Sequence, residues 1–279
     1  MGWLIGAVVF WGLAWAANVR LAGVSGGRLI RVLVPLIFGV TVLVLWEGIV
    51  RGLGIDPVIL PAPTVIGAQI ARSLPTLWVD FVQTIVRGAL AGYVFGSVGG
   101  LLVAIAVDRS PFLQRGLLPI GNFVAALPIV GVAPIMVMWF GFGWESKAAV
   151  VVAMVFFPML INCVAGLGEA GSMQRDLMKT YAASYWQTLV TLRLPAAMPF
   201  IFNGLKICTT LALIGAIVAE FFGSPIRGMG FRISTEVGRL NLPMVWAEIA
   251  VAALAGSVLY GAVALIERWV TFWHPSQRV

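Results

Sequence analysis

Long runs of apolar residues, separated by charges, prolines and glycines, follow one another along the chain. A helix of roughly 20 apolar residues crosses the hydrocarbon core of a bilayer, so each such run predicts a membrane-spanning helix. The runs cover approximately residues 1–17, 31–50, 81–107, 117–140, 148–167, 199–221 and 244–270. The pattern therefore predicts an all-α integral membrane protein with about seven transmembrane helices.

Composition supports the bilayer as the natural solvent. Of the 279 residues, 61% are apolar and only 10% are charged, whereas a soluble domain has about 25% charged residues. The net charge of +7 comes from Lys and Arg residues that are spread singly along the chain. They form no basic run with interleaved aromatic residues, which excludes nucleic acid as an expected partner.

The first apolar run is short and contains Trp3, Trp11 and Trp15, which suit a membrane interface. A secretory signal peptide is the alternative interpretation, but a signal begins with a basic segment and no Lys or Arg precedes Arg20. We therefore expect a retained helix. Residues 1–30 are then an extra N-terminal helix with a cytoplasmic linker, and residues 31–279 form the main domain.

Orientation follows from the Lys and Arg residues between the spans, because positive flanks stay in the cytoplasm. One set of alternating loops holds ten of them and the other set holds six. This bias places the N-terminus outside and the C-terminus in the cytoplasm. In the outer loop 51–80 we expect Thr64 to cap an amphipathic helix that continues to about Trp78.

The longest inner loop, residues 169–198, is helical in pattern without being a span. Tyr181, Tyr185, Leu189 and Leu192 recur at intervals that place them on one helical face at the membrane surface. Packing on the protein's own helices and docking to a partner both fit this pattern.

The same loop resembles that of the inner-membrane permease subunits of bacterial ABC importers. Their loop reads Glu-Ala-Ala, three residues, Gly, nine residues, Ile, one residue, Leu-Pro. The spacing is intact here from Asp176 through Ala182 and Leu192 to Leu194-Pro195, although Asp replaces Glu and Ala182 replaces the glycine. Alanine is strained by about 1–2 kcal/mol in a left-handed turn. We therefore expect the turn to be right-handed or to lie elsewhere.

Other segments resemble the branch of this family that handles nitrate, sulfonates, taurine, bicarbonate and some vitamin precursors. They are Leu60-Pro61-Ala62-Pro63, the stretch 128–143 with Trp139-Phe140-Gly141, the run 194–206, and the ending Trp273-His274-Pro275-Ser276. The resemblance covers roughly residues 31–279, with residues 1–30 added to a six-helix plan.

The resemblance implies a transport subunit that is not itself an enzyme. The loop would dock as a coupling helix on a separate ATPase subunit, which would bind ATP and Mg²⁺, since this chain lacks a GxxxxGK[ST] phosphate loop. The implied partners also include a periplasmic solute-binding protein and a second copy of the chain, in the bacterial inner membrane. The coupling role falls on Asp176, Ala182, Ser184, Trp186, Leu189 and Pro195, with Trp186 as the expected anchor.

Residues of the translocation pathway are expected where polar groups or prolines interrupt apolar helices. The candidates are Pro128, Pro134, Met136, Met138 and Glu220. The prolines are equally compatible with simple kinks. Glu220 fits either a structural pair with an outer arginine, such as Arg227 or Arg232, or a role in a gate.

The chain offers no catalytic or metal-binding constellation. His274 is the only histidine, and Cys163 and Cys208 lie in separate apolar stretches, which indicates two buried reduced thiols. We expect neither a metal nor a cofactor on this chain. The alternative function is a self-sufficient secondary transporter or channel, in which Glu220 and Glu248 would couple ions.

Overall fold

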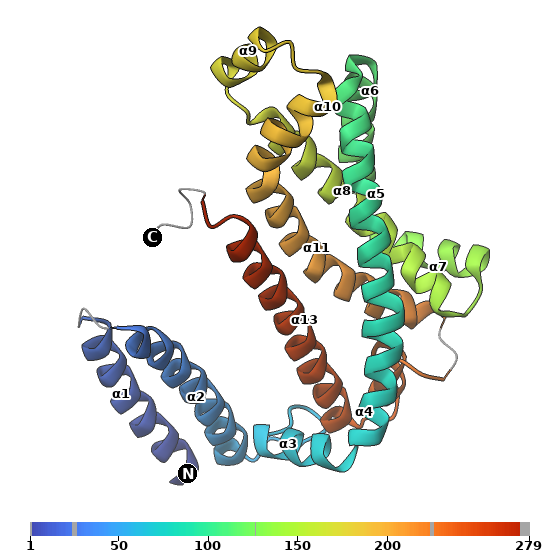
Figure 1. Ribbon diagram of the computed structural model, residues 1–279. Helices are drawn as coiled ribbons and strands as arrows, with labels where there is room; N and C mark the ends of the chain where they lie inside the picture. Colours follow the sequence, from blue (N-terminus) through green and yellow to red (C-terminus); the bar gives the residue numbers. More distant parts are fainter. Residues whose placement is uncertain (1, 24–26, 126, 224–225, 274–279) are drawn as a thin grey trace. The chain divides into compact units, whose positions relative to one another are not determined.

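The computed structural model describes residues 2–23, 27–125, 127–223 and 226–273, and in these ranges the regular structure is helical throughout. The helices are α1 (Gly2–Ala22), α2 (Arg28–Leu53), α3 (Pro63–Arg72), α4 (Leu74–Phe81), the π-helix η1 (Val82–Leu90), α5 (Ala91–Arg109), α6 (Pro111–Ala125), α7 (Ile129–Phe140), α8 (Trp144–Gly168), α9 (Ser172–Thr180), α10 (Tyr185–Thr188), the π-helix η2 (Leu189–Arg193), α11 (Leu194–Phe222), α12 (Met229–Gly238) and α13 (Leu242–Val270) (Figure 1). The predicted all-α membrane class is confirmed.

Six helical segments in the described part of the chain are long and apolar enough to cross a membrane. They are Gly2–Ala22, Leu29–Leu53, Leu74–Arg109, Trp144–Gly168, Tyr185–Phe222 and Leu242–Val270. The stretch 117–140, predicted as one span, instead forms parts of two helices. α6 ends at Ala125 and the 12-residue α7 begins at Ile129, with extended backbone at Pro128. Proline disfavours helical backbone in the residue before it, which explains a break at this position.

The described chain divides into two compact units, which we describe separately. The first contains residues 1–77 and 233–250. In it α1 packs along α2, and two glycines of α2 allow the backbones to approach closely. A Cβ atom at Gly52 would lie 2.9 Å from the Cβ of Leu4, and one at Gly48 would overlap Ala7.

The segment after α2 corrects the prediction for Thr64. Helix α3 begins at Pro63 and its N-cap is Ala62, so Thr64 is not the cap. Its hydroxyl instead donates to Glu47 at 2.7 Å, and its backbone N–H donates to the other oxygen of Glu47 at 3.0 Å. Arg51 also pairs with Glu47 and donates to the Thr64 hydroxyl. Thr64 thus ties the start of α3 to the end of α2.

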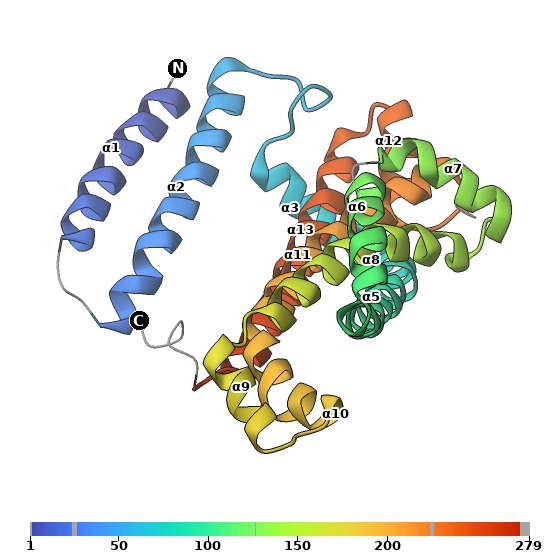
Figure 2. The same cartoon turned by 90° about the horizontal axis from the view of Figure 1, so that it is seen from above.

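The second unit, residues 78–232 and 251–279, contains a core of three long helices, α5, α8 and α11. Viewed from above, α5 lies beside α8 (Figure 2). Gly92, Gly96 and Gly100 form a stripe on α5 that faces α8, and a Cβ atom at Gly100 would lie 2.8 Å from the carbonyl oxygen of Phe156. The core residues of α8 are Val151, Val155, Met159, Leu160, Cys163 and Leu167. Both cysteines are buried and unpaired, as predicted.

Two of the three core helices are preceded directly by π-helical segments. η1 leads into α5, and η2 leads into α11. A π-helical segment has a wider turn than an α-helix, and such segments occur frequently at functional sites. Each of these two segments carries a residue of a polar cluster described below.

Candidate functional site

The loop 169–198 lies at one end of the core and contains two short helices, α9 and α10, with a turn between them, followed by η2 and the first turn of α11 (Figure 1). α9 ends at Thr180 and α10 begins at Tyr185, so the predicted single helical face does not form. Tyr181 is 75% exposed, whereas Leu189 is buried in the core. Leu189 is therefore a packing residue and offers no surface to a partner. Pro195 lies in the first turn of α11 and is partly buried.

Ala182 has a left-handed backbone with a φ of 52°, which makes our expectation for this turn wrong. The conformation closes a Schellman motif at the end of α9. The N–H of Ala182 donates to the carbonyl of Lys179 at 2.9 Å, and the N–H of Ala183 donates to that of Met178 at 3.0 Å. The two hydrogen bonds hold alanine at a position that usually carries glycine.

Ser184 begins α10 through a capping box. Its backbone N–H donates to the side-chain oxygen of Gln187 at 2.7 Å, and its hydroxyl accepts from the N–H of Gln187 at 3.3 Å. Ser184 therefore acts locally, by fixing the direction in which Tyr185 and Trp186 leave the turn.

Five large apolar side chains are exposed on this loop. Met173, Leu177, Tyr181 and Trp186 lie on α9, the turn and α10, and Val190 lies in η2; Trp186 is 56% exposed. The Trp186 ring packs edge-on against Tyr185, with centroids 5.4 Å apart. Asp176 lies in α9 and pairs with Lys179 at 2.9 Å, with both side chains largely exposed. Apolar surface rimmed by charge is typical of protein contact sites.

A second set of contacts fastens the loop to the core. Arg193 in η2 binds both carboxylate oxygens of Asp108, at 2.5 and 2.7 Å, and its Nε donates to the carbonyl of Leu167 at 3.0 Å. The Tyr185 hydroxyl donates to Asp108 at 3.0 Å. We call Asp108, Tyr185 and Arg193 the Asp108 clamp. It joins the loop to the last turns of α5 and α8.

Sequence reasoning missed this clamp. Asp108 and Arg193 are 85 positions apart, and neither belongs to the loop pattern that identified the other residues. The available signal was an acidic residue directly after an apolar run, together with an arginine two positions before Pro195. That signal does not identify the partner.

At the opposite end of the same helices, Glu220 lies at the centre of a buried polar cluster. Both of its carboxylate oxygens lie 2.9 Å from the hydroxyl of Thr84 in η1, and one accepts from the N–H of Gly230 at 2.8 Å. Lys147 of α8 is close enough to interact electrostatically with Glu220. Lys147 also donates to the carbonyls of Phe142 and Gly223.

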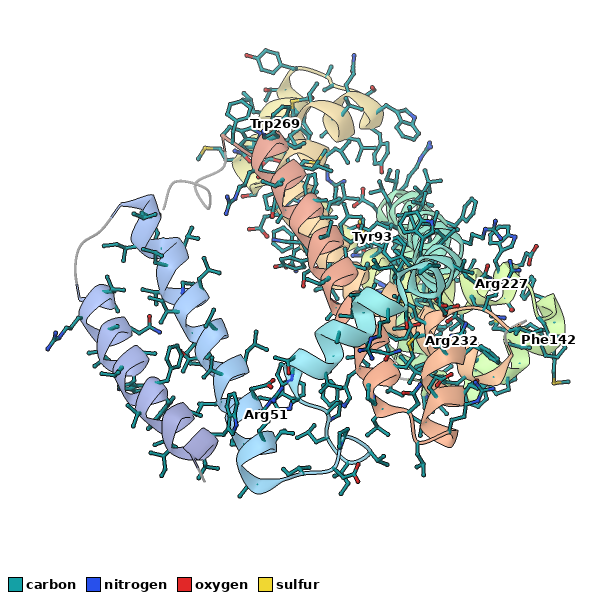
Figure 3. The ribbon with its side chains drawn as sticks, turned by 90° about the horizontal axis from the view of Figure 1, so that it is seen from below. Arg51, Tyr93, Phe142, Arg227, Arg232 and Trp269 are labelled. Carbon is teal, nitrogen blue, oxygen red and sulfur yellow. The ribbon has the colours of Figure 1, made fainter. Side chains whose placement is uncertain are left out.

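Of the two arginines suggested for Glu220, Arg232 has a different acidic partner. Its Nε donates to Asp80 at 2.8 Å, and Asp80 also accepts from the N–H of Gly228 at 2.7 Å. Arg232 is labelled in Figure 3, which views the unit from this end. Asp80, Thr84, Lys147, Glu220 and Arg232 are called the Glu220 network below. It fastens the segment 228–232 to α4, η1 and α11.

The remaining pathway candidates lie on α7. Pro128 is the N-cap of this helix and Pro134 lies inside it. Met136 lines a cavity of about 240 Å³ between α6, α7, α8 and α11, together with Val132, Met154, Pro158 and Leu211. Met138 is 82% exposed and lies outside this cavity. The structure thus brings Met136 and Pro158 together and separates Met138 from them.

Comparison with known proteins identifies a family of membrane transport components. Residues 92–272 match the family of the inner membrane component of binding-protein-dependent transport systems. The matched range includes the 169–198 loop, the Asp108 clamp and most of the Glu220 network.

Whole-length relatives are permeases as well. A probable ABC transporter permease protein of Haemophilus influenzae is 32% identical over 246 residues, 86% of this chain and 98% of that protein. The riboflavin transport system permease protein of Chloroflexus aurantiacus is 30% identical over 84% of this chain and 87% of its own length. The formylaminopyrimidine transport permease protein of Halalkalibacterium halodurans is 28% identical over 90% and 99%. The chain therefore belongs to the family of ABC transporter permeases that form the inner membrane component of binding-protein-dependent transport systems.

Proposed function

We propose that this chain is the membrane-spanning permease subunit of an ATP-driven importer, and that it translocates a small solute delivered by a periplasmic binding protein. The observation that carries this proposal is the exposed apolar surface of the 169–198 loop, made by Met173, Leu177, Tyr181 and Trp186. It lies in the segment whose spacing matches the coupling loop of the family.

The ATPase partner would cover this surface. Large aromatic side chains contribute most to protein contacts, so Trp186 is the anchor, and Tyr181 and Leu177 extend the contact along α9. Asp176, Ala182, Ser184 and Pro195 shape the loop rather than fill a pocket. ATP and Mg²⁺ would be held by that partner.

For the pathway we propose the region of α7 and its neighbours, between two copies of the chain in a homodimer. The cavity beside Met136 and Pro158 supports this choice, because broken helices in membranes line cavities or are buried in protein. Pro128 and Pro134 set the course of α7, and Met138 lies on its outer side, available to a second copy. Glu220 closes the end of the pathway by fastening the segment 228–232.

The solute class that we propose is a heterocyclic vitamin precursor or a small anion such as nitrate, a sulfonate, taurine or bicarbonate. The names of two relatives, for riboflavin and formylaminopyrimidine, favour the heterocycles. We also propose a location in the bacterial inner membrane. We place the N-terminus outside, and the C-terminus and the 169–198 loop in the cytoplasm, where an ATPase subunit is available. This orientation needs a seventh crossing besides the six long helical segments. The helices α6 and α7 together supply it, since they carry the chain from Asp108 at one end of the core to Lys147 at the other.

The test is recovery of the tagged chain from its native membrane in mild detergent, with mass spectrometry of the proteins that accompany it. We expect an ATPase subunit and a solute-binding protein with the natural chain. With Trp186→Ala we expect at least a tenfold loss of the ATPase subunit and unchanged insertion in the membrane.

Trp78→Ala is the matched control. Trp78 is 65% exposed and, like Trp186, has one aromatic neighbour: it stacks on Phe81 with ring centroids 5.5 Å apart. It lies at the end of the unit opposite the loop, so its loss should leave ATPase recovery unchanged. Recovery of the chain alone, together with solute uptake in proteoliposomes without ATP, would overturn the proposal.

A further inference from the structure

The Asp108 clamp joins two parts of the chain that have different tasks under the proposed function. Tyr185 and Arg193 flank Trp186 on the loop, whereas Asp108 and the carbonyl of Leu167 lie on α5 and α8. The described residues of α9 are mostly exposed, so the loop's own helix contributes little packing. Force on Trp186 therefore reaches α5 and α8 through the clamp as well as through the chain.

The geometry of the clamp suits this task. Guanidinium and carboxylate meet in a bidentate contact, which fixes orientation as well as distance. The side chains of Arg193 and Asp108 are only 16% and 11% exposed, so water screens the pair weakly. The Arg109 guanidinium lies 5.6 Å from the centroid of the Tyr185 ring and holds the aromatic side of the clamp.

The backbone supports the same assignment. Arg193 is the last residue of η2, whose wider turn lies between α10 and α11. A π-helical turn interrupts the regular α-helix and is frequent at functional sites. To the buried packing of Leu189 at the start of η2 the clamp adds a polar contact from its end to α5 and α8.

We propose that Asp108 is a positioning residue for coupling: through Arg193 and Tyr185 it makes the 169–198 loop move as one body with α5 and α8 when the ATPase subunit changes state. This inference rests on the proposed function. It assigns a role in coupling to Asp108 and Arg193, which the spacing pattern of the loop does not specify.

The experiment uses the intact complex with its ATPase subunit, purified from the native membrane. Spin labels are placed at Met173→Cys and Val94→Cys, both exposed in the natural chain. Residue 94 lies about 21 Å along α5 from Asp108 at 1.5 Å per residue, so this label is well separated from the clamp and from the label on the loop, and pulsed electron paramagnetic resonance measures the distance between the two labels. The probe is a non-hydrolysable ATP analogue with Mg²⁺. The natural clamp should keep the distance between the labels unchanged when the analogue binds.

With Asp108→Asn we expect the analogue to shift or broaden that distance by several ångströms. Arg193→Lys, which keeps the charge but loses the bidentate contact, should give an intermediate change. Glu267→Gln is the matched control: it removes the partner of Lys206, an ion pair of 2.8 Å with side chains 21% and 12% exposed that involves no residue of the loop. It should behave as the natural chain does.

The outcomes separate the two proposals. Distances that stay insensitive to the analogue in Asp108→Asn and Arg193→Lys, with the ATPase subunit still bound, would overturn the role of the clamp alone. A complex that lacks an ATPase subunit even with the natural chain would overturn the proposed function, and the inference with it.

Discussion

The Asp108 clamp and the Glu220 network lie at opposite ends of the same three helices and differ in burial. In the network Asp80, Thr84, Lys147 and Glu220 are at most 1% exposed, and only the Arg232 side chain, at 21%, reaches the surface. The clamp side chains of Asp108 and Arg193 are 11% and 16% exposed. Both clusters use α5 or its π-helical start, α8, and α11 or its π-helical start. Polar contacts thus close the three-helix core at each end, and the carboxylates at the Glu220 end are the more deeply buried.

The two clusters also differ in the segment that each one fastens to the core. In the Glu220 network Asp80 pairs with Arg232, Glu220 accepts from the Thr84 hydroxyl, and further bonds come from backbone N–H groups of the segment 228–230. Such a cluster cannot be opened without leaving buried charges and backbone groups unpaired. The clamp holds a loop whose other surface is exposed. One cluster therefore maintains the fold, and the other transmits a contact.

The largest effect is expected from Glu220→Leu. The substitution leaves the hydroxyl of Thr84 and the N–H of Gly230 without their acceptor and removes a charge beside Lys147, which should cost about 3–5 kcal/mol of stability. The measurement is the Tm of the purified protein in detergent. Glu169→Gln, which changes an exposed carboxylate at the C-terminal end of α8, far from the network, is the control. Equal Tm values for the two variants would show that the network does not stabilise the fold.

A smaller effect is expected from Asp108→Ala. It leaves Arg193 partly solvated, so we expect a loss of about 1–3 kcal/mol. Glu267→Ala, at the ion pair of similar exposure with Lys206, should lower the Tm to a similar degree. If Asp108→Ala were as destabilising as Glu220→Leu, the clamp would be a structural element like the network, and the contrast between the two ends would disappear.

Whether a feature of the structure could be predicted from the sequence depends on how far apart along the chain the interacting residues lie. Apolar run length predicted the helical spans because the bilayer imposes it residue by residue. The same rule joined residues 117–140 into one helix, since run length carries no information about the extended backbone at Pro128. Thr64 was assigned to a local cap because its actual partner, Glu47, lies 17 positions away.

The candidate site divides in the same way. The spacing pattern located the 169–198 loop, and Ser184 acts through Gln187, three residues away, so local reasoning reaches both. The partners of Glu220 and Arg193 are set by tertiary packing: Arg232 was an equally good partner for Glu220 by charge, but it contacts Asp80. One sequence does not show which of several arginines pairs with a carboxylate that is distant along the chain.

The smallest effect tests the turn on which the clamp and the exposed aromatic residues both depend. Ala182 adopts a left-handed backbone, so Ala182→Gly removes strain of about 1–2 kcal/mol, while glycine loses about 0.5–1 kcal/mol more conformational entropy on folding. A net gain of roughly 0.5–1 kcal/mol follows from that difference, and the Tm in detergent should rise slightly. Ala183→Gly, at the adjacent position without a left-handed backbone, should lower it. A lower Tm for both variants would show that the Schellman motif around Ala182 does not form in the protein. The orientation described for Trp186, which depends on that motif, would then be wrong as well.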